Sequence, residues 1–111
     1  MGTPADATGA RGLRTDASYA AVMVAIPESA RPILDGPNLA HLVTIDPDGA
    51  PQISCVWVGL DGDEILFASL GPWRKLRNLQ RDPRVGLSVE SPELNHLGMR
   101  EYLVLQGTAR V

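Results

Sequence analysis

The chain has 111 residues, of which 44% are hydrophobic and 21% are charged, and its formal net charge is −3 at pH 7. This length fits one small domain, and the composition is that of a folded globular protein rather than a disordered one. The longest apolar run, around residues 20–26, is far too short to cross a bilayer, and we recognise no signal peptide. The only cysteine, Cys55, excludes an internal disulfide, and we expect it to be a small buried hydrophobe. We therefore expect a cytoplasmic protein without a metal of its own and without a membrane partner.

Residues 1–18 are small, polar and aperiodic, which predicts a flexible tail, and we assign residues 19–111 to a single domain. Within that domain, residues 27–36 are expected to form a short helix. Pro27 suits the first turn of a helix, and Gly36 suits its end.

Three runs of β-branched and apolar residues follow, at 39–45, 51–60 and 64–69. The turns between them are Asp-Pro-Asp-Gly and Asp-Gly-Asp, and Gly and Asp tolerate the backbone conformations that tight hairpins need. The pattern predicts a three-strand antiparallel meander. We interpret the four turn aspartates as turn formers and not as calcium ligands, because the twelve-residue loop with its terminal glutamate is missing.

The next element is a helix over residues 72–81, in which Trp73, Leu76 and Leu79 form one apolar stripe. Asp82-Pro83 ends it, because the residue before a proline is disfavoured in the helical conformation.

After this helix we expect a strand at 85–89, a loop at 91–100 and a last strand at 101–111. Short strands with one inserted helix predict a mainly β protein with short helices, built as a small antiparallel barrel. Because the sequence stops in mid-strand, we expect an open barrel edge and a C-terminal part that is missing from this chain.

Five of the ten Lys and Arg residues fall between positions 71 and 84: Arg74, Lys75, Arg77, Arg81 and Arg84. Arg74 and Lys75 would lie in the first helical turn, where a cation is disfavoured by about 0.3–1 kcal/mol. A bound phosphate or carboxylate would reverse this penalty, whereas exposed side chains could simply turn into solvent. The run by itself favours neither alternative. It does not predict nucleic-acid binding, which needs a broad positive face.

Gln52 and Ser54 share one face of their strand with Val56. If this face points inward, two polar groups sit at the mouth of an apolar pocket, an arrangement that suits a heterocyclic ring. The alternative is a solvent-exposed face. We expect His41 to be a core or packing residue in its strand, with a catalytic base as the alternative, and His96 to lie in a loop near a pocket. Neither histidine has the partners of a nucleophilic triad, so we assign no catalytic residue.

The order of these segments resembles the flavin and deazaflavin oxidoreductases of the split β-barrel, pyridoxamine-phosphate-oxidase-like superfamily. The resemblance covers residues 25–111, and its most specific parts are DGAPQIS at 48–54, KLRNLQRDPR at 75–84 and GTAR at 107–110. Within the superfamily the chain is most similar to the branch that uses coenzyme F-420, an 8-hydroxy-5-deazaflavin. Members of the family usually continue through a further helix and strand.

The resemblance implies a homodimer with a cofactor cleft at each end of its interface. The ring would lie against Gln52, Ser54 and Val56, and the phosphate tail would meet Lys75 with its neighbours. The full set of implied cofactor-binding residues is Gln52, Ser54, Val56, Ser69, Arg74, Lys75 and Asn78.

The implied function is an oxidoreductase that transfers hydride between reduced F-420 and an unsaturated or heterocyclic small molecule. Two alternatives stay open: an FMN-dependent oxidoreductase on the same fold, and a cofactor-binding protein without turnover.

Overall fold

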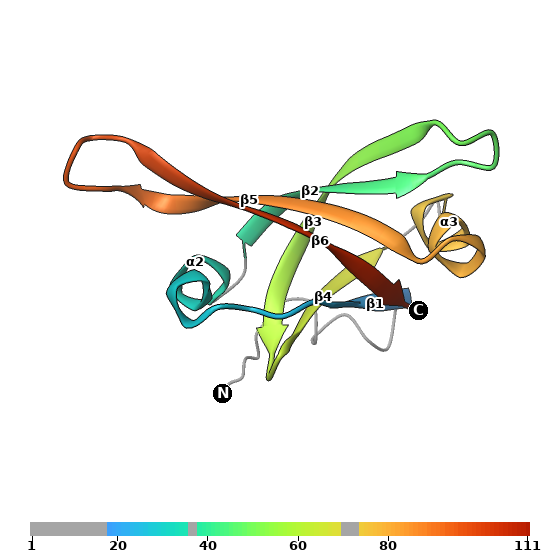
Figure 1. The fold of residues 1–111 in the computed structure, drawn as a ribbon, viewed down its shortest axis with the longest axis horizontal. Helices are drawn as coiled ribbons and strands as arrows, with labels where there is room; N and C mark the ends of the chain where they lie inside the picture. The colour runs from blue at the N-terminus through green and yellow to red at the C-terminus, as the bar shows by residue number, and fades with distance from the viewer. Residues whose placement is uncertain (1–17, 36–37, 70–73) are drawn as a thin grey trace.

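Six antiparallel strands close into a barrel in the computed structural model, which describes residues 18–35, 38–69 and 74–111 (Figure 1). The strands are β1 (Ser18–Met23), β2 (Asn38–Ile45), β3 (Pro51–Asp61), β4 (Glu64–Ser69), β5 (Arg84–Leu94) and β6 (Arg100–Arg110). Around the barrel their order is β1-β4-β3-β2-β5-β6. The predicted fold class, mainly β with short helices in a barrel, is confirmed.

The predicted meander is β2–β3–β4, and both of its turns use glycine in the left-handed region. Gly49 has φ +89° and Gly62 has φ +64°, values that residues with a Cβ rarely adopt. In the first turn, Asp48 Oδ1 accepts a hydrogen bond from the Ala50 amide at 3.0 Å. The positions of both hairpins, predicted from the Asp and Gly residues of their turns, are therefore confirmed.

The expected open barrel edge is wrong, because β1 closes the barrel. It pairs with β4 on one side, where Ala20 lies opposite Phe67, and with β6 on the other, where Val22 lies opposite Ala109. Ala20 and Val22 are both buried in the core. Strand β1 is not among the strands predicted from the sequence, although its apolar run is evident there. Ser18 begins β1, and the rest of the expected tail lies outside the described residues.

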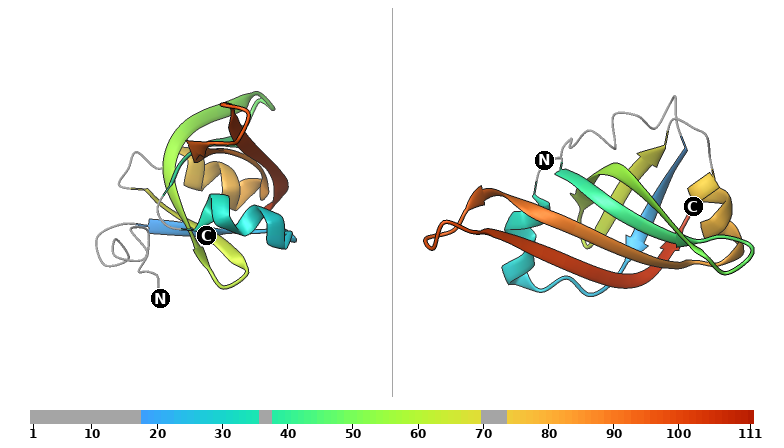
Figure 2. Two further views of the ribbon diagram at one scale, coloured as in Figure 1. Left: turned by 90° about the vertical axis from the view of Figure 1, so that its left-hand side faces the viewer. Right: turned by 90° about the horizontal axis from the view of Figure 1, so that it is seen from above.

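The helices are short and lie at opposite ends of the barrel: η1 (Glu28–Ala30) leads into α2 (Arg31–Leu34) at one end, and α3 (Arg74–Arg81) lies at the other (Figure 2). Each contributes leucine side chains to the core, Leu34 from α2 and Leu76 with Leu79 from α3. Both predicted helices are confirmed. The predicted start of the second helix at position 72, and Trp73, lie outside the described residues.

Both ends of the loop expected at 91–100 are strand instead. Ser91–Leu94 continues β5, and β6 already begins at Arg100. The Ser91 side chain stabilises the extension, because its hydroxyl accepts from the Glu101 amide at 3.0 Å and donates to the Glu93 carbonyl at 2.8 Å. These bonds replace part of the strand ladder near the irregularity between Glu90 and Leu94. His96 is exposed in the turn between the strands.

The inward face of β2 carries Ala40, Leu42 and Thr44, all with no exposed surface. His41 therefore points outward and is exposed, so its expected packing role in the barrel interior is wrong. Cys55 is also exposed rather than buried, because it lies opposite His41 on the outer face of β3. In both strands, inward and outward side chains alternate so that these two residues lie on the outward face. The apolar pattern of the sequence alone did not determine which face each residue occupies. Among the described residues, no helix is long and apolar enough to span a membrane.

Barrel closure depends on a close backbone approach at Gly107. A Cβ built there would lie 2.7 Å from the Met23 carbonyl oxygen, a separation that side chains do not adopt. We predict that Gly107→Ala destabilises the protein by about 1–3 kcal/mol, as overpacking usually does, because β1 must move away from β6. Urea denaturation measures the change. Gly86→Ala is the matched control, since its Cβ would meet Val43 at an ordinary 3.6 Å, and equal losses in the two variants would contradict the proposed strain.

Candidate functional site

The inner face of β3 changes from polar to apolar along the strand. Gln52 and Ser54 are half-buried, whereas Val56 and Val58 are fully buried. The face that carries Gln52 and Ser54 therefore points inward, as the first of the two alternatives required. Val56 belongs to the hydrophobic core itself, so its side chain packs against other core residues.

The Ser54 hydroxyl has no hydrogen-bond partner among the described residues, although it is buried. A buried hydroxyl without a partner costs about 1–3 kcal/mol, which makes it uncommon in a folded protein. At this position β3 pairs with β2, where Ser54 lies opposite Leu42, and its pairing with β4 begins only at Val58. The Ser54 hydroxyl is the kind of group that a polar ligand atom would satisfy.

Arg74 begins α3 and forms an ion pair with Asp46, the residue that follows β2. The pair is bidentate: the Arg74 Nε donates to Asp46 Oδ1 at 2.9 Å, and the Arg74 Nη2 donates to Oδ2. A carboxylate at the helix start thus offsets the unfavourable cation in the first turn. Part of the negative charge expected near Arg74 is therefore provided by the chain itself, as the Asp46 carboxylate.

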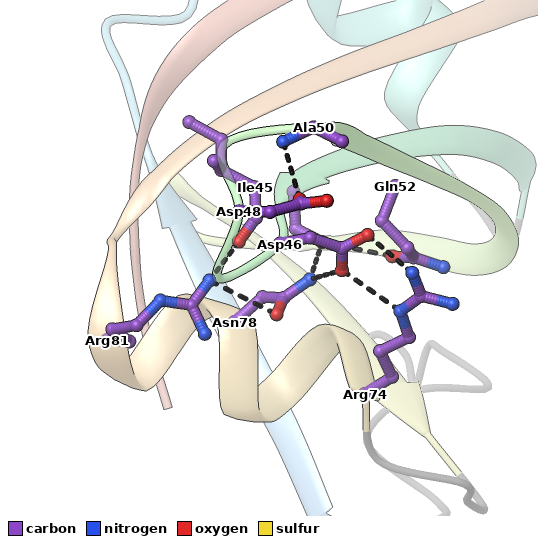
Figure 3. Close-up of polar contacts among 9 residues, drawn as sticks. Ile45, Asp46, Asp48, Ala50, Gln52, Arg74, Asn78 and Arg81 are labelled. Atoms are coloured by element: carbon purple, nitrogen blue, oxygen red, sulfur yellow. Dashed lines mark hydrogen bonds and ion pairs between the residues drawn. The ribbon is translucent and has the colours of Figure 1, made fainter.

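Asn78, one turn further along α3, is 2% exposed and joins the same carboxylate to β2 and β3 (Figure 3). Its Nδ2 donates to Asp46 Oδ1 at 2.9 Å and to Thr44 Oγ1 at 3.0 Å. Thr44, fully buried, donates in turn to Gln52 Oε1 at 2.9 Å. A continuous hydrogen-bond chain therefore connects α3 with the polar part of β3.

These contacts make Asp46 a stronger acid than an ordinary aspartate. Hydrogen bonds from Arg74, then from Asn78, lower its pKa below the usual 3.8, and burial opposes them only in part. The same ion pair raises the pKa of Arg74 above its ordinary value. At neutral pH the carboxylate is ionised, so it can only accept hydrogen bonds.

The five cations of the basic run have different surroundings. Besides Arg74, two others have internal partners: Arg81 donates to the Ile45 carbonyl and to Asn78 Oδ1, and Arg84 pairs with Asp82 at 2.8 Å. Among the described residues, no partner is found for Lys75 or Arg77. Lys75 is half-buried and Arg77 is exposed. These two cations are the ones available to an external anion.

The structure thus brings Gln52, Arg74 and Asn78 together in one network and puts Ser54 two residues from Gln52 on the same strand face. The side chain of Ser69, at the end of β4, lies outside the described part of the chain. Sequence reasoning missed Thr44 and Asp46 as members of the site. The signal was a threonine and an aspartate two residues apart at a strand end, but their partners on α3, Arg74 and Asn78, lie more than 25 positions further along the chain.

These features define the class of protein as a small six-stranded antiparallel β-barrel. The barrel has polar residues on the inward face of β3 and a cationic helix at one end. The chain belongs to the pyridoxamine 5′-phosphate oxidase family, whose profile matches residues 26–111. It is also similar to a solved structure described as an F-420 reductase, with 34% sequence identity and a TM-score of 0.63. That similarity covers 75% of this chain and 63% of the reductase chain, so the chain matches less than two thirds of the reductase's length.

The lowered pKa of Asp46 makes a prediction about acid stability. Because the folded state holds this carboxylate ionised more strongly than the unfolded state, its stabilisation is present above pH 4 and is lost as the pH falls below about 4. Asp46→Asn should therefore lower the free energy of unfolding at pH 7 and reduce its dependence on pH between 5 and 2. Urea denaturation at several pH values measures both effects.

Some acid sensitivity must remain in that variant, because Arg84 lowers the pKa of Asp82 to about 2. Asp48→Asn in the same turn is the matched control, since among the described residues Asp48 accepts a hydrogen bond from the Ala50 amide alone. An unchanged pH dependence in Asp46→Asn would contradict the assignment of Asp46 as the central anion.

Proposed function

We propose that the protein is an oxidoreductase that transfers hydride between reduced coenzyme F-420 and an unsaturated or heterocyclic small molecule. The family and the F-420 reductase similarity support an oxidoreductase that uses a flavin or deazaflavin. The single observation that carries the proposal is the inner face of β3, where a buried hydroxyl without a partner, Ser54 Oγ, adjoins a half-buried amide, Gln52. A planar heterocycle with several polar ring atoms fits such a face.

The cationic start of α3 fits the phosphate of such a cofactor. Lys75 and Arg77 have no internal partner among the described residues, and they stand at the first turn of the helix, where the backbone dipole also favours anions. Arg74 is neutralised by Asp46 and is 60% exposed at its side chain, so it would contribute hydrogen bonds more than net charge. We assign Lys75 as the main phosphate ligand.

When bound, F-420 supplies a carbon centre that donates or accepts hydride. The protein's own residues bind and orient: Gln52 and Ser54 provide polar contacts to the ring, and Lys75 holds the phosphate. The buried valines beyond Ser54 keep water from the inner part of the strand. No residue of this chain needs to act as a general acid or base in this assignment.

Titration of the purified protein with F-420 and FMN, side by side, tests the cofactor. We expect a colourless protein that binds added F-420 more tightly than FMN. A yellow protein with a flavin spectrum would favour the FMN alternative. Binding of reduced F-420 without its oxidation, across a panel of enones and quinones, would favour a carrier without turnover. Failure to bind either cofactor would overturn the proposal.

Neutralising Lys75 should weaken cofactor binding and leave folding nearly unchanged. A hydrogen bond to a charged group contributes roughly 1.5–3 kcal/mol, so Lys75→Ala should raise the Kd by about one to two decades. The affinity should also depend less on salt than in the parent. Arg77→Ala is the comparison, because it removes an equal charge from the other unpartnered cation of this helix, and it should raise the Kd less than Lys75→Ala does. Arg81→Ala would be unsuitable for this comparison, since Arg81 contacts Ile45 and Asn78. Equal Kd values for the two variants would refute the assignment of Lys75.

We further propose that the protein is a homodimer through the outer face of β3, β2, β5 and β6. Cross-strand neighbours on this face are Leu39 with Trp57, Val43 with Ile53, and Ser88 with Val104. Four of them are large apolar residues that are more than half exposed, namely Leu39, Ile53, Trp57 and Val104. An apolar surface that runs across several strands usually marks an interaction site.

A groove of about 560 Å³ crosses the β2–β5–β6 part of this face and is lined by His41, Val43, Gly86, Val104 and Gln106 among others. Glycine at position 86 leaves room there, since a Cβ would lie in ordinary contact with Val43. A second copy of the chain, with the same apolar surface, is a complementary occupant.

A charge in the middle of this face should dissociate the dimer. We predict that Val104→Glu converts a dimer at low micromolar concentration into a monomer, because the glutamate would lose its hydration in the interface. Sedimentation velocity measures the assembly. Ala25→Glu, at an exposed position beyond β1, is the control and should remain dimeric. A parent protein that is monomeric at these concentrations would contradict the dimer.

A further inference from the structure

We infer that Thr44 is a positioning residue that orients the Gln52 amide. In this orientation, the amide presents its N–H donors to a ligand, and its oxygen is held by Thr44. The inference rests on the proposed function for the location of the ligand, but the orientation follows from the hydrogen-bond chain alone. The orientation decides which ligand atoms the site accepts.

The orientation starts at Asn78, whose amide is fixed at both ends. The Asp46 carboxylate can only accept, so the atom 2.9 Å from it must be the Asn78 nitrogen. The Arg81 guanidinium can only donate, so the atom 3.3 Å from it must be the Asn78 oxygen. The two charged neighbours therefore demand the same amide orientation, which leaves no equally good flipped alternative.

The next step passes through the Thr44 hydroxyl. It accepts from Asn78 Nδ2 at 3.0 Å, so its own proton is free to be donated to the next group. That group is the Gln52 amide at 2.9 Å, and the atom that accepts the proton must be Oε1. Thr44 has no exposed surface, so water does not compete for these bonds.

The Gln52 nitrogen is consequently the end of the amide that Thr44 leaves unbound. No described residue accepts a hydrogen bond from it. Figure 3 shows this nitrogen and the outer part of the Arg74 guanidinium on the same side of Asp46. Arginine also offers only donors, so this part of the site attracts acceptor atoms such as ring carbonyl, ring nitrogen or phosphate oxygen atoms, and it disfavours N–H and O–H groups.

Gln52→Glu tests the polarity with little change in shape. Thr44 can still donate to a glutamate oxygen, but the outward atom becomes an acceptor. With F-420 and FMN as probes in fluorescence titrations, we expect at least a tenfold higher Kd than in the parent. Gln80→Glu, at an exposed position of α3, adds the same charge away from the network and controls for repulsion of an anionic probe. Binding by Gln52→Glu that is as tight as binding by Gln80→Glu would overturn the inference.

Thr44→Val tests the positioning role, because it removes the hydroxyl and keeps the shape of the side chain. We expect about a three- to tenfold higher Kd, with rescue in Thr44→Ser, which restores the hydroxyl. A purely packing role of Thr44 would give the opposite order of the two variants. Urea denaturation shows whether each variant is folded.

NMR of the parent without any cofactor separates this inference from the proposed function. In the oriented amide, the Gln52 Hε2 protons point away from Thr44, and the Asn78 Hδ2 protons show contacts to the Thr44 side chain. Contacts of the Gln52 Hε2 protons with the Thr44 methyl group would show a flipped amide and would overturn the inference even if cofactor binds. Failure of F-420 and FMN to bind, with the expected NMR contacts present, would instead refute the proposed function alone.

Discussion

The buried carboxylate of Asp46 is the interaction on which the organisation of this end of the barrel depends. It lies at the end of β2, accepts from Arg74 and Asn78 of α3, and through Thr44 fixes the side chain of Gln52 on β3. A carboxylate that is 10% exposed at its side chain is expensive to desolvate, and the bidentate arginine and the amide offset this cost. The same contacts hold the helix against the sheet, so one ionised group sets both the position of α3 and the polarity of the site.

The basic run at residues 74–84, which spans α3 and the start of β5, serves two purposes that its charge pattern does not separate. Arg74, Arg81 and Arg84 have partners within the chain, whereas Lys75 and Arg77 have none among the described residues. The helix therefore has a structural face directed at the β2–β3 turn and a set of cations left for an external anion. Because the internal pairs neutralise part of the charge, the helix start keeps a limited positive field, which suits a phosphate group better than a polyanion.

Strand β3 illustrates how one strand can serve both a ligand and a partner chain. Its inward residues, Gln52 and Ser54, provide the polar groups of the candidate site, and its outward residues, Ile53 and Trp57, belong to the exposed apolar face. The period of two in a strand makes these two surfaces alternate residue by residue. In the proposed dimer, association would therefore fix the strand that carries the ligand contacts, which gives a physical reason for the two properties to occur together.

The sequence by itself determined the elements whose cause is local. Asp-Gly turns predicted the β2–β3–β4 meander, the Leu76–Leu79 stripe and Asp82-Pro83 predicted α3, and the quoted motifs indicated the family. Only the tertiary structure decided that β1 closes the barrel, that His41 and Cys55 face outward, and that Asp46 is the partner of Arg74. Barrel closure and the ion pair join residues that are distant in sequence, and a one-residue change of phase in a strand exchanges its two faces. Neither the pairing of distant residues nor the choice of inward face in a strand leaves a local signal in the sequence. Both were therefore determined only by the packing of the whole barrel.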